Sequence, residues 1–261
     1  MISVKPKKKL GQHFLRDKNI ALKVADLVDN HIDCNILEIG PGTGVLTEFL
    51  MNKAKEKLVM VDIDTESVEY LRQKHGFGEE LWDTDFLKEA KNIFDSKQGP
   101  WFVVGNFPYN ISSQILFKIL ENRGRVEGFG GMFQREVARR ICSAPNSKEY
   151  GILSVLLQAY YKLEYCFTVS EGVFDPPPKV KTGVMKGVKY RDTLNSCSDR
   201  IFLDVVKTAF NQRRKTLSNS LRKFNLNKEE FVKTRFANLR PENLNVEDFV
   251  ELTQLIENES K

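Results

Sequence analysis

The sequence predicts an α/β fold in which a parallel, doubly wound sheet is followed by a small helical domain. Up to about residue 190, short apolar runs typical of strands alternate with segments of helical periodicity. Beyond residue 199 only helical patterns remain. A length of 261 residues, 41% hydrophobic and 29% charged, allows one sizeable domain and a small appendage. We therefore expect domains at 1–190 and 191–261, with the polar segment 191–200 as the linker.

The individual elements follow from local patterns. Strands are expected at the short apolar runs 35–39, 58–61, 81–83, 101–105, 128–134, 163–169 and 184–190. Helices are expected where apolar residues recur every three or four positions, at 18–30, 45–52, 65–75, 113–121, 135–141, 151–161, 201–210, 216–224, 228–235 and 246–257. The last two strands are joined by one proline-rich loop, so this edge of the sheet is expected to be antiparallel.

Composition narrows the class of protein. The net charge of +5 permits a nucleic-acid partner but does not require one. No apolar run is long enough to span a bilayer, and no secretory signal core follows the N-terminal lysines. The four cysteines are far apart and form no metal-ligand spacing with the three histidines. We expect a cytoplasmic monomer with reduced thiols, no membrane segment and no metal.

A glycine-rich turn, GPGTG, lies between an expected strand and an expected helix. Glycine at 40, 42 and 44 allows a tight turn and close approach of the backbone to a ligand. The spacing is not that of dinucleotide sites, because Val45 occupies the position of their third glycine. The turn therefore favours a nucleoside over a pyrophosphate.

Three carboxylates stand at or near the ends of successive strands, where open α/β sheets bind ligands. Asp62 lies about 20 residues beyond the turn, where an acidic side chain can accept both ribose hydroxyls. Asp85 follows the third strand, where it can accept a hydrogen bond from the amine of an adenine. Glu38 precedes the glycine turn itself. Together they predict a nucleoside-binding site.

The fourth strand ends in Asn106, Phe107, Pro108 and Tyr109. The exocyclic amine of adenine is a poor nucleophile, because its lone pair is delocalised into the ring. The Asn106 side-chain carbonyl and the Phe107 backbone carbonyl can accept hydrogen bonds from the two N–H groups of this amine. Pro108 stiffens the turn that presents both carbonyls. Tyr109 can stack on the base. Related loops serve DNA-adenine and protein-glutamine methylation, so the loop alone does not select the acceptor.

These blocks resemble the ribosomal RNA adenine dimethyltransferases, specifically the bacterial type that acts near the 3′ end of the small-subunit RNA. The resemblance covers nearly the whole chain in order. It rests on KKKLGQHFL (7–15), EIGPGTG (38–44), the DxD at 62–64, GNFPYNISS (105–113), MFQREVARRI (132–141), FDPPPKV (174–180) and AFNQRRKTLSNSL (209–221). It implies a Rossmann-like methyltransferase domain, a small helical C-terminal domain and S-adenosylmethionine as the cofactor.

The resemblance also implies roles for particular residues. The expected cofactor contacts are His13, Leu15, Gly40, Gly42, Asp62, Asp85 and Asn106. Phe174 is expected as a second aromatic wall opposite Tyr109, with the target adenine between them. Two methyl groups would be added to each of two adjacent adenines.

Three positions depart from the family pattern or leave a choice. Asp62 stands where many members have glutamate, and Thr182 stands where serine is common. Of Asp83 and Asp85, we assign the adenine contact to Asp85, because Phe86 follows it as in the family.

Basic residues gather near several of these blocks, as expected for contacts to RNA phosphates. The clusters are 5–9, 135–140, 179–181 and 213–215, from which we select Lys8, Arg139, Lys179, Arg213, Arg214 and Lys215. The expected partner is the small ribosomal subunit with its RNA. Two alternatives stay open: a large-subunit enzyme of the macrolide-resistance type, and a protein that acts mainly as an assembly factor.

Overall fold

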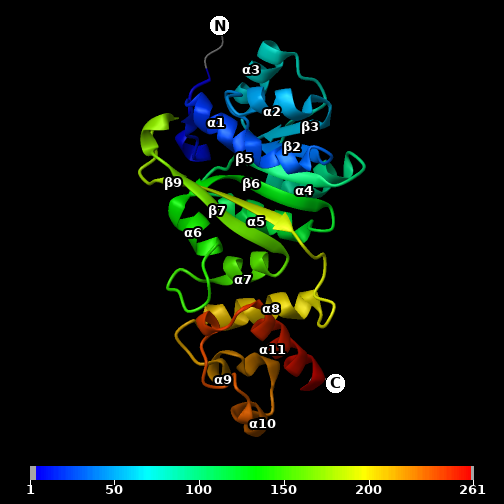
Figure 1. The fold of residues 1–261 in the computed structure, drawn as a ribbon, viewed down its shortest axis with the longest axis vertical. Coiled ribbons are helices and arrows are strands. Elements are labelled where there is room, and N and C mark those ends of the chain that lie inside the picture. Colours follow the sequence, from blue (N-terminus) through cyan, green and yellow to red (C-terminus); the bar gives the residue numbers. More distant parts are fainter. Residues whose placement is uncertain (1–3, 260–261) are drawn as a thin grey trace. The chain divides into compact units, whose positions relative to one another are not determined.

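The computed structural model describes residues 4–259 and divides into two compact units (Figure 1). The first, here the sheet unit, comprises the residues up to Ala138 together with Glu164–Lys189. The second, here the helical unit, comprises Arg139–Leu163 and the residues from Tyr190 on. The α/β prediction is confirmed, and the two units are described separately below.

A seven-stranded sheet with the order β4-β3-β2-β5-β6-β9-β7 organises the sheet unit. The strands β2 to β6 run parallel to one another, and β9 runs antiparallel to β6. A separate antiparallel pair joins β1 to β8. The strand bounds are β1 Phe14–Leu15, β2 Asn35–Ile39, β3 Leu58–Asp62, β4 Leu81–Asp83, β5 Trp101–Asn106, β6 Val126–Gln134, β7 Tyr161–Val169, β8 Phe174–Asp175 and β9 Thr182–Lys189.

The helices follow the predicted order. The α-helices are α1 Lys18–Ala25, α2 Thr47–Ala54, α3 Thr65–His75, α4 Phe86–Asp95, α5 Ser112–Glu121, α6 Arg135–Ile141, α7 Ile152–Gln158, α8 Asp199–Asn211, α9 Leu217–Ser220, α10 Lys228–Lys233 and α11 Val246–Glu259. Short 3-10 turns are η1 Lys8–Leu10, η2 Asp26–His31, η3 Lys55–Lys57, η4 Glu171–Val173, η5 Arg222–Phe224 and η6 Pro241–Asn243.

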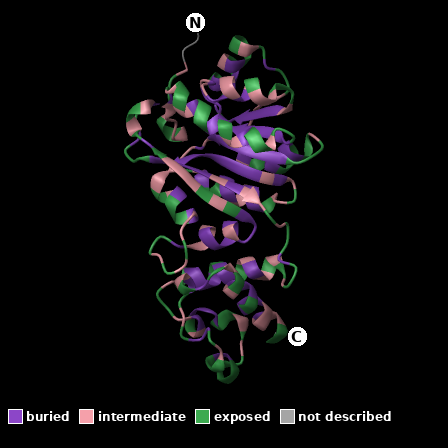
Figure 2. Ribbon diagram, in the orientation of Figure 1, coloured by how far each residue is buried: buried purple, intermediate pink, exposed green. Residues whose placement is uncertain are grey.

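The central strands are buried along their whole length, as Figure 2 shows for the middle of the sheet. Every residue of β2 and β3 is buried, which explains why these strands appear in the sequence as continuous apolar runs. One core joins Ile36 and Met60 of the sheet to Val24 of α1, Leu50 of α2 and Leu71 of α3. This core holds the ends of the parallel strands in register, and the functional pocket forms at those ends.

The helical unit has its own apolar core, formed by α7, α8 and α11 with the segments that follow α8. Phe202 of α8 and Phe249 of α11 are fully buried, and the Phe210 ring lies 6.0 Å from the Phe249 ring. Buried Leu156 and Leu157 bring α7 into this core. Residues 139–163 therefore group with the C-terminal helices, which differs from the expected boundary at residue 190.

Several local features differ from the predicted elements. The helix predicted at 18–30 ends at Ala25 and is followed by the 3-10 turn η2. Helix α4 was not predicted, although Asp85 caps its first turn by accepting a hydrogen bond from the Leu87 backbone N–H. The pairing of β1 with β8 was not predicted either, because a two-residue strand carries no periodicity. The predicted helix 216–224 is instead α9 followed by the turn η5, which ends at Asn225 in the left-handed conformation.

Candidate active site

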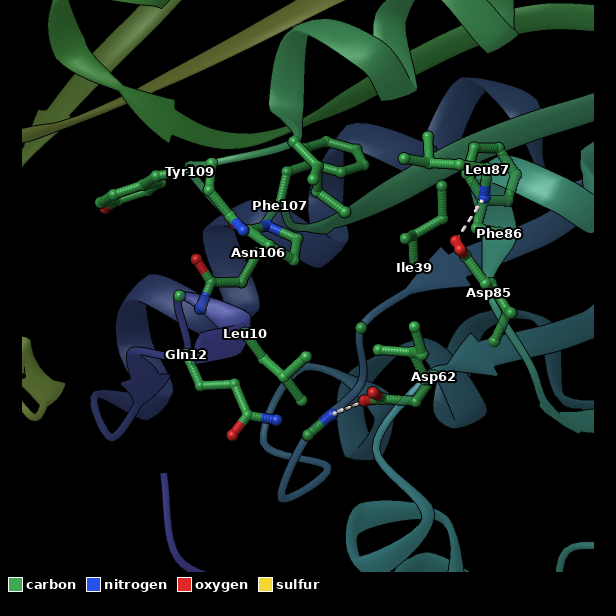
Figure 3. A pocket seen from close by; sticks show the side chains of 18 of the residues that line it. Leu10, Gln12, Ile39, Asp62, Asp85, Phe86, Leu87, Asn106, Phe107 and Tyr109 are labelled. Carbon is green, nitrogen blue, oxygen red and sulfur yellow. Dashed lines mark hydrogen bonds between the residues drawn. The ribbon is translucent and has the colours of Figure 1, made fainter. Parts of the chain in front are cut away.

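A pocket that is partly open to solvent lies at the carboxyl ends of β2, β3, β4 and β5 (Figure 3). It combines the strand ends, the turn after β5 and a segment before β1. Its lining is Leu10, Gly11, Gln12, His13, Phe14, Ile39, Gly40, Gly42, Val61, Asp62, Ile63, Thr84, Asp85, Phe86, Leu87, Asn106, Phe107, Pro108, Tyr109, Asn110 and Ile111. The glycine turn, two of the three predicted carboxylates (Asp62 and Asp85) and the asparagine loop thus meet in one place, whereas Glu38 does not line the pocket.

The glycine turn closes one side of this pocket. Gly42 has a φ of +55°, and a Cβ added there would lie 2.8 Å from the ring of Phe14. The position therefore excludes any side chain, both by conformation and by contact. The backbone of the turn is left directly against the pocket, as the sequence predicted for a ligand-binding loop.

Asp62 is a buried carboxylate that anchors the turn. Its two oxygens accept hydrogen bonds from the backbone N–H of Gly42, at 3.1 Å, and of Asp64, at 2.9 Å. Burial raises the pKa of Asp62 to about 6, although the two backbone N–H donors act in the opposite direction. The carboxylate lines the pocket, so it is placed to accept further hydrogen bonds from a bound hydroxyl group.

The other three carboxylates near the strand ends have different environments. Asp85 lines the pocket while one of its oxygens caps α4, whereas Asp83 is exposed, accepts a hydrogen bond from Thr65 and does not line it. Glu38 is 1% exposed and lies outside the pocket lining. Burial, together with the charge of Asp62, raises the pKa of Glu38 to about 8. Glu38 is therefore a core residue in which burial favours the protonated form.

The Asn106 side chain is held by the segment before β1. Its amide nitrogen donates a hydrogen bond to the backbone carbonyl of His13, at 2.8 Å. This bond orients the amide and leaves its oxygen as the free acceptor. The ring of Phe107 is buried against Phe133 of β6, with 4.6 Å between the ring centroids. This contact fixes the loop after β5 to the neighbouring strand.

Tyr109 is held at its hydroxyl end. That hydroxyl forms a hydrogen bond with the hydroxyl of Thr182, a fully buried residue at the start of β9. Burial raises the pKa of Tyr109. The ring lies 5.6 Å from the ring of His13, so both aromatic faces border the same pocket.

Residues 7–16, here the N-terminal arm, cross the pocket. The C-terminal end of the arm is fixed by β8 and the residues on either side of it. Arg16 donates a backbone hydrogen bond to Val173, and the His13 Nδ1 atom lies 2.7 Å from the carbonyl of Pro176. Leu15 pairs in register with Phe174. Sequence reasoning did not identify this pairing, since the two residues are far apart in the chain.

Most of the predicted contact residues line the pocket, but two do not. The residues that do are His13, Gly40, Gly42, Asp62, Asp85, Asn106, Phe107, Pro108 and Tyr109. Leu15 is 5% exposed and Phe174 is 3% exposed, and both belong to the apolar core. The β1–β8 pairing directs these two side chains inward, so neither forms a wall of the pocket in this structure.

The pocket chemistry fits an adenosine-containing cofactor. Two carboxylates can accept hydrogen bonds from ribose hydroxyls and from an adenine amine, and Ile63 and Phe86 supply apolar surface for the ring. Ile63, Phe86, Gln12 and Asn110 also line the pocket but were not singled out from the sequence. In the sequence, the only sign that these residues line the pocket is that each stands next to a motif residue.

The predicted RNA-contacting residues lie in both units. Lys8 and Lys179 of the sheet unit are exposed, and so are Arg139, Arg214 and Lys215 of the helical unit. Arg213 is half-buried, donates to the carbonyl of Ser147 at 3.2 Å and lies 3.7 Å from the carboxylate of Glu242. Its side chain therefore holds the helical unit together internally.

Within residues 4–259, no helix is long and apolar enough to cross a membrane. In the same range, no cluster of histidine, cysteine and acidic side chains has the arrangement of a metal site.

A nucleoside-binding pocket at the strand ends of a Rossmann-like sheet, next to an Asn-Phe-Pro-Tyr loop, defines an S-adenosylmethionine-dependent methyltransferase. The model of the ribosomal RNA adenine dimethylase family matches residues 3–258, and the chain belongs to that family.

Relatives with curated names support this placement. The chain is 54% identical over 228 residues to a ribosomal RNA small subunit methyltransferase A of Flavobacterium johnsoniae, covering 87% of this chain and 86% of the relative. The corresponding protein of Bacteroides thetaiotaomicron is 52% identical over 222 residues, 84% and 82% of the two chains. A dimethyladenosine transferase from Plasmodium falciparum has the same fold, with a TM-score of 0.73 at 22% identity over 94% of this chain and 97% of that one.

Proposed function

We propose that this chain dimethylates the N6 amines of two adjacent adenines near the 3′ end of small-subunit ribosomal RNA. The observation that carries the proposal is the Asn106 side chain, whose amide nitrogen is bonded to His13 and whose oxygen remains an acceptor beside the pocket. The curated relatives, each named as a small-subunit methyltransferase at about half identity, support the choice of substrate.

The chain's own residues position the acceptor amine. The Asn106 side-chain oxygen and the Phe107 backbone carbonyl each accept a hydrogen bond from one N–H of the amine. These two hydrogen bonds localise the lone pair on the amine nitrogen. Tyr109, held by Thr182, stacks on the adenine once it is out of its helix. S-adenosylmethionine, when bound by Gly40, Gly42, Asp62 and Asp85, supplies an electrophilic methyl group. On transfer the donor would leave as a neutral thioether and the methylated amine would release one proton to solvent. Little general-base chemistry is therefore required, and positioning carries most of the acceleration.

The remaining assignments belong to the same proposal. Lys8, Arg139, Lys179, Arg214 and Lys215 contact RNA phosphates, and the exposure of each one supports this role. Phe174 acts as the second wall for the adenine only if the β1–β8 pair shifts, because its side chain is buried. The enzyme works as a cytoplasmic monomer and contributes to maturation of the small subunit.

The test is methyl transfer from radiolabelled S-adenosylmethionine to immature small subunits and, in parallel, to large-subunit RNA. Nucleoside analysis then identifies the product. We expect dimethyladenosine in the small-subunit reaction alone. Label in the large-subunit RNA would replace this substrate with that of the resistance-type enzymes. Binding of the subunit without any label would favour a role in assembly without catalysis.

A further inference from the structure

The arm that crosses the pocket has a second anchor at its outer end. The side chain of Asp64, just beyond β3, is 1% exposed and accepts hydrogen bonds from two arm residues. These donors are the Lys7 ammonium, at 2.5 Å, and the Gln12 side-chain amide, at 2.8 Å. The Lys7 ammonium also lies 3.0 Å from the carboxylate of Glu66. The outer arm is thus tied to one buried carboxylate.

The backbone of the same residue is connected to the glycine turn. The backbone N–H of Asp64 donates to Asp62, whose other oxygen holds the turn at Gly42. Within the arm, the Lys7 backbone N–H donates to the Gln12 side chain at 2.7 Å, which closes the segment into a loop. A continuous chain of hydrogen bonds therefore runs from the glycine turn to the outer arm.

Between its two anchors, the arm touches both halves of the active site. Phe14 packs on Gly42 of the glycine turn, where a Cβ would lie 2.8 Å from its ring. A Cβ at Gly11 would lie 2.7 Å from the side chain of Asn110, which directly follows the Asn-Phe-Pro-Tyr loop (106–109). The backbone of the arm therefore lies directly against the end of this catalytic loop. Leu10, Gly11, Gln12, His13 and Phe14 all line the pocket.

We propose that Asp64 is a positioning residue for cofactor binding, because it holds the N-terminal arm in place as a wall of the pocket. Neither Asp64 nor Lys7 lines the pocket. The charge of Asp64 also acts on Asp62, so Lys7→Met, which keeps that charge, is the variant that isolates the route through the arm. The inference rests on the proposed assignment of this pocket to S-adenosylmethionine.

The charge balance at Asp64 agrees with this role. Burial acts to raise the pKa of Asp64, but hydrogen bonds from Gln12, Lys7 and Ser67 outweigh it and the pKa is lowered. A carboxylate that stays ionised in a buried position is held by its donors. Asp64→Asn removes the charge and also replaces one of the two acceptor oxygens with an NH2 group, which then faces either the Lys7 or the Gln12 donor.

The experiment compares three variants of the full-length protein with the wild type. Asp64→Asn and Lys7→Met each break the anchor from one side, and the third variant combines them. Lys18→Met is the matched control, because it also removes a lysine near the N-terminus, where Lys18 makes only a 3.5 Å surface contact with Glu48. Calorimetric titration with S-adenosylhomocysteine measures affinity, and hydrogen exchange of residues 7–14 measures arm order.

Each single variant is expected to weaken S-adenosylhomocysteine binding roughly tenfold, or about 1.4 kcal/mol, and to speed exchange in the arm. The double variant should be no weaker than the worse single one, because both remove the same contact. Lys18→Met should match the wild type throughout. A role in stability alone would lower the melting temperature and leave affinity unchanged.

The outcomes separate this inference from the proposed function. Unchanged arm exchange in both single variants would overturn the inference, and so would faster exchange with unchanged affinity. Asp62→Asn tests the pocket itself, since Asp62 lines it. If Asp62→Asn also left affinity unchanged, the pocket would not be the cofactor site, and the proposed function would lose its structural basis. Should Asp64→Asn fail to fold, Lys7→Met carries the test alone.

Discussion

The amide nitrogen of Asn106 donates a hydrogen bond to the backbone carbonyl of His13, 2.8 Å away and 93 residues earlier in the chain. The contact joins the catalytic loop to the N-terminal arm. It also selects which end of the amide faces the substrate, because the nitrogen is already engaged. The arm therefore contributes to the chemistry as well as to the wall of the pocket.

Asn106→Ala is expected to lower the rate of methyl transfer at least about a hundredfold, because it removes the acceptor that localises the amine lone pair. Asn106→Asp keeps an acceptor but loses the donor to His13, and should also be strongly impaired. Binding of the small subunit should be largely retained in both variants. Methyl transfer assays and filter binding check this, and activity within a few fold of the wild type would refute the role of Asn106.

The hydrogen bond between Thr182 and Tyr109 can be tested by two substitutions of similar size. Thr182→Val removes the hydroxyl and should raise the KM for RNA several-fold, because the Tyr109 ring is no longer held for stacking. Thr182→Ser keeps the hydroxyl and should behave as the wild type. Steady-state kinetics of both variants decide the question. Loss in Thr182→Ser with none in Thr182→Val would point to packing of the buried methyl group instead, because only the serine variant removes it.

Charge reversal at Arg214 and Lys215 tests the phosphate contacts of the helical unit. The double variant Arg214→Glu/Lys215→Glu should bind RNA at least about tenfold more weakly and show a shallower dependence of affinity on salt. Arg200→Glu, an exposed residue at the start of α8, is the control for added negative charge. Binding is measured across a salt series. An unchanged salt slope would exclude these two residues as phosphate contacts.

Glu38 gives a prediction for stability against pH. The folded protein keeps the Glu38 proton up to about pH 8, whereas the unfolded chain loses it near 4.5. Ionisation thus favours unfolding, and the free energy of unfolding falls as pH rises through this window, by at most about 1.4 kcal/mol per pH unit. Glu38→Gln removes this component, so its stability should depend less steeply on pH. Urea unfolding between pH 5 and 8 measures both slopes, and identical slopes would contradict the assignment.

Local patterns in the sequence were sufficient to predict most elements and most of the pocket. Strands such as β2 and β3 are short apolar runs, and the carboxyl ends of parallel strands meet at one edge of the sheet. Asp62, Asp85 and Asn106 follow three such strands, so their convergence could be expected. Helix α4 was missed, although its N-cap was already assigned a role in the cofactor site.

The sequence by itself determined the α/β class, the chemistry at the strand ends and the family, because each depends on residues close together in the chain. Only the tertiary structure decided that Leu15 and Phe174 pair and turn into the core, and that Asp64 holds Lys7 and Gln12 from more than 50 residues away. It also decided that residues 139–163 join the helical unit. These contacts depend on which distant segments pack together. Burial of apolar and charged side chains decides that packing, and it leaves no pattern among residues that are neighbours in the sequence.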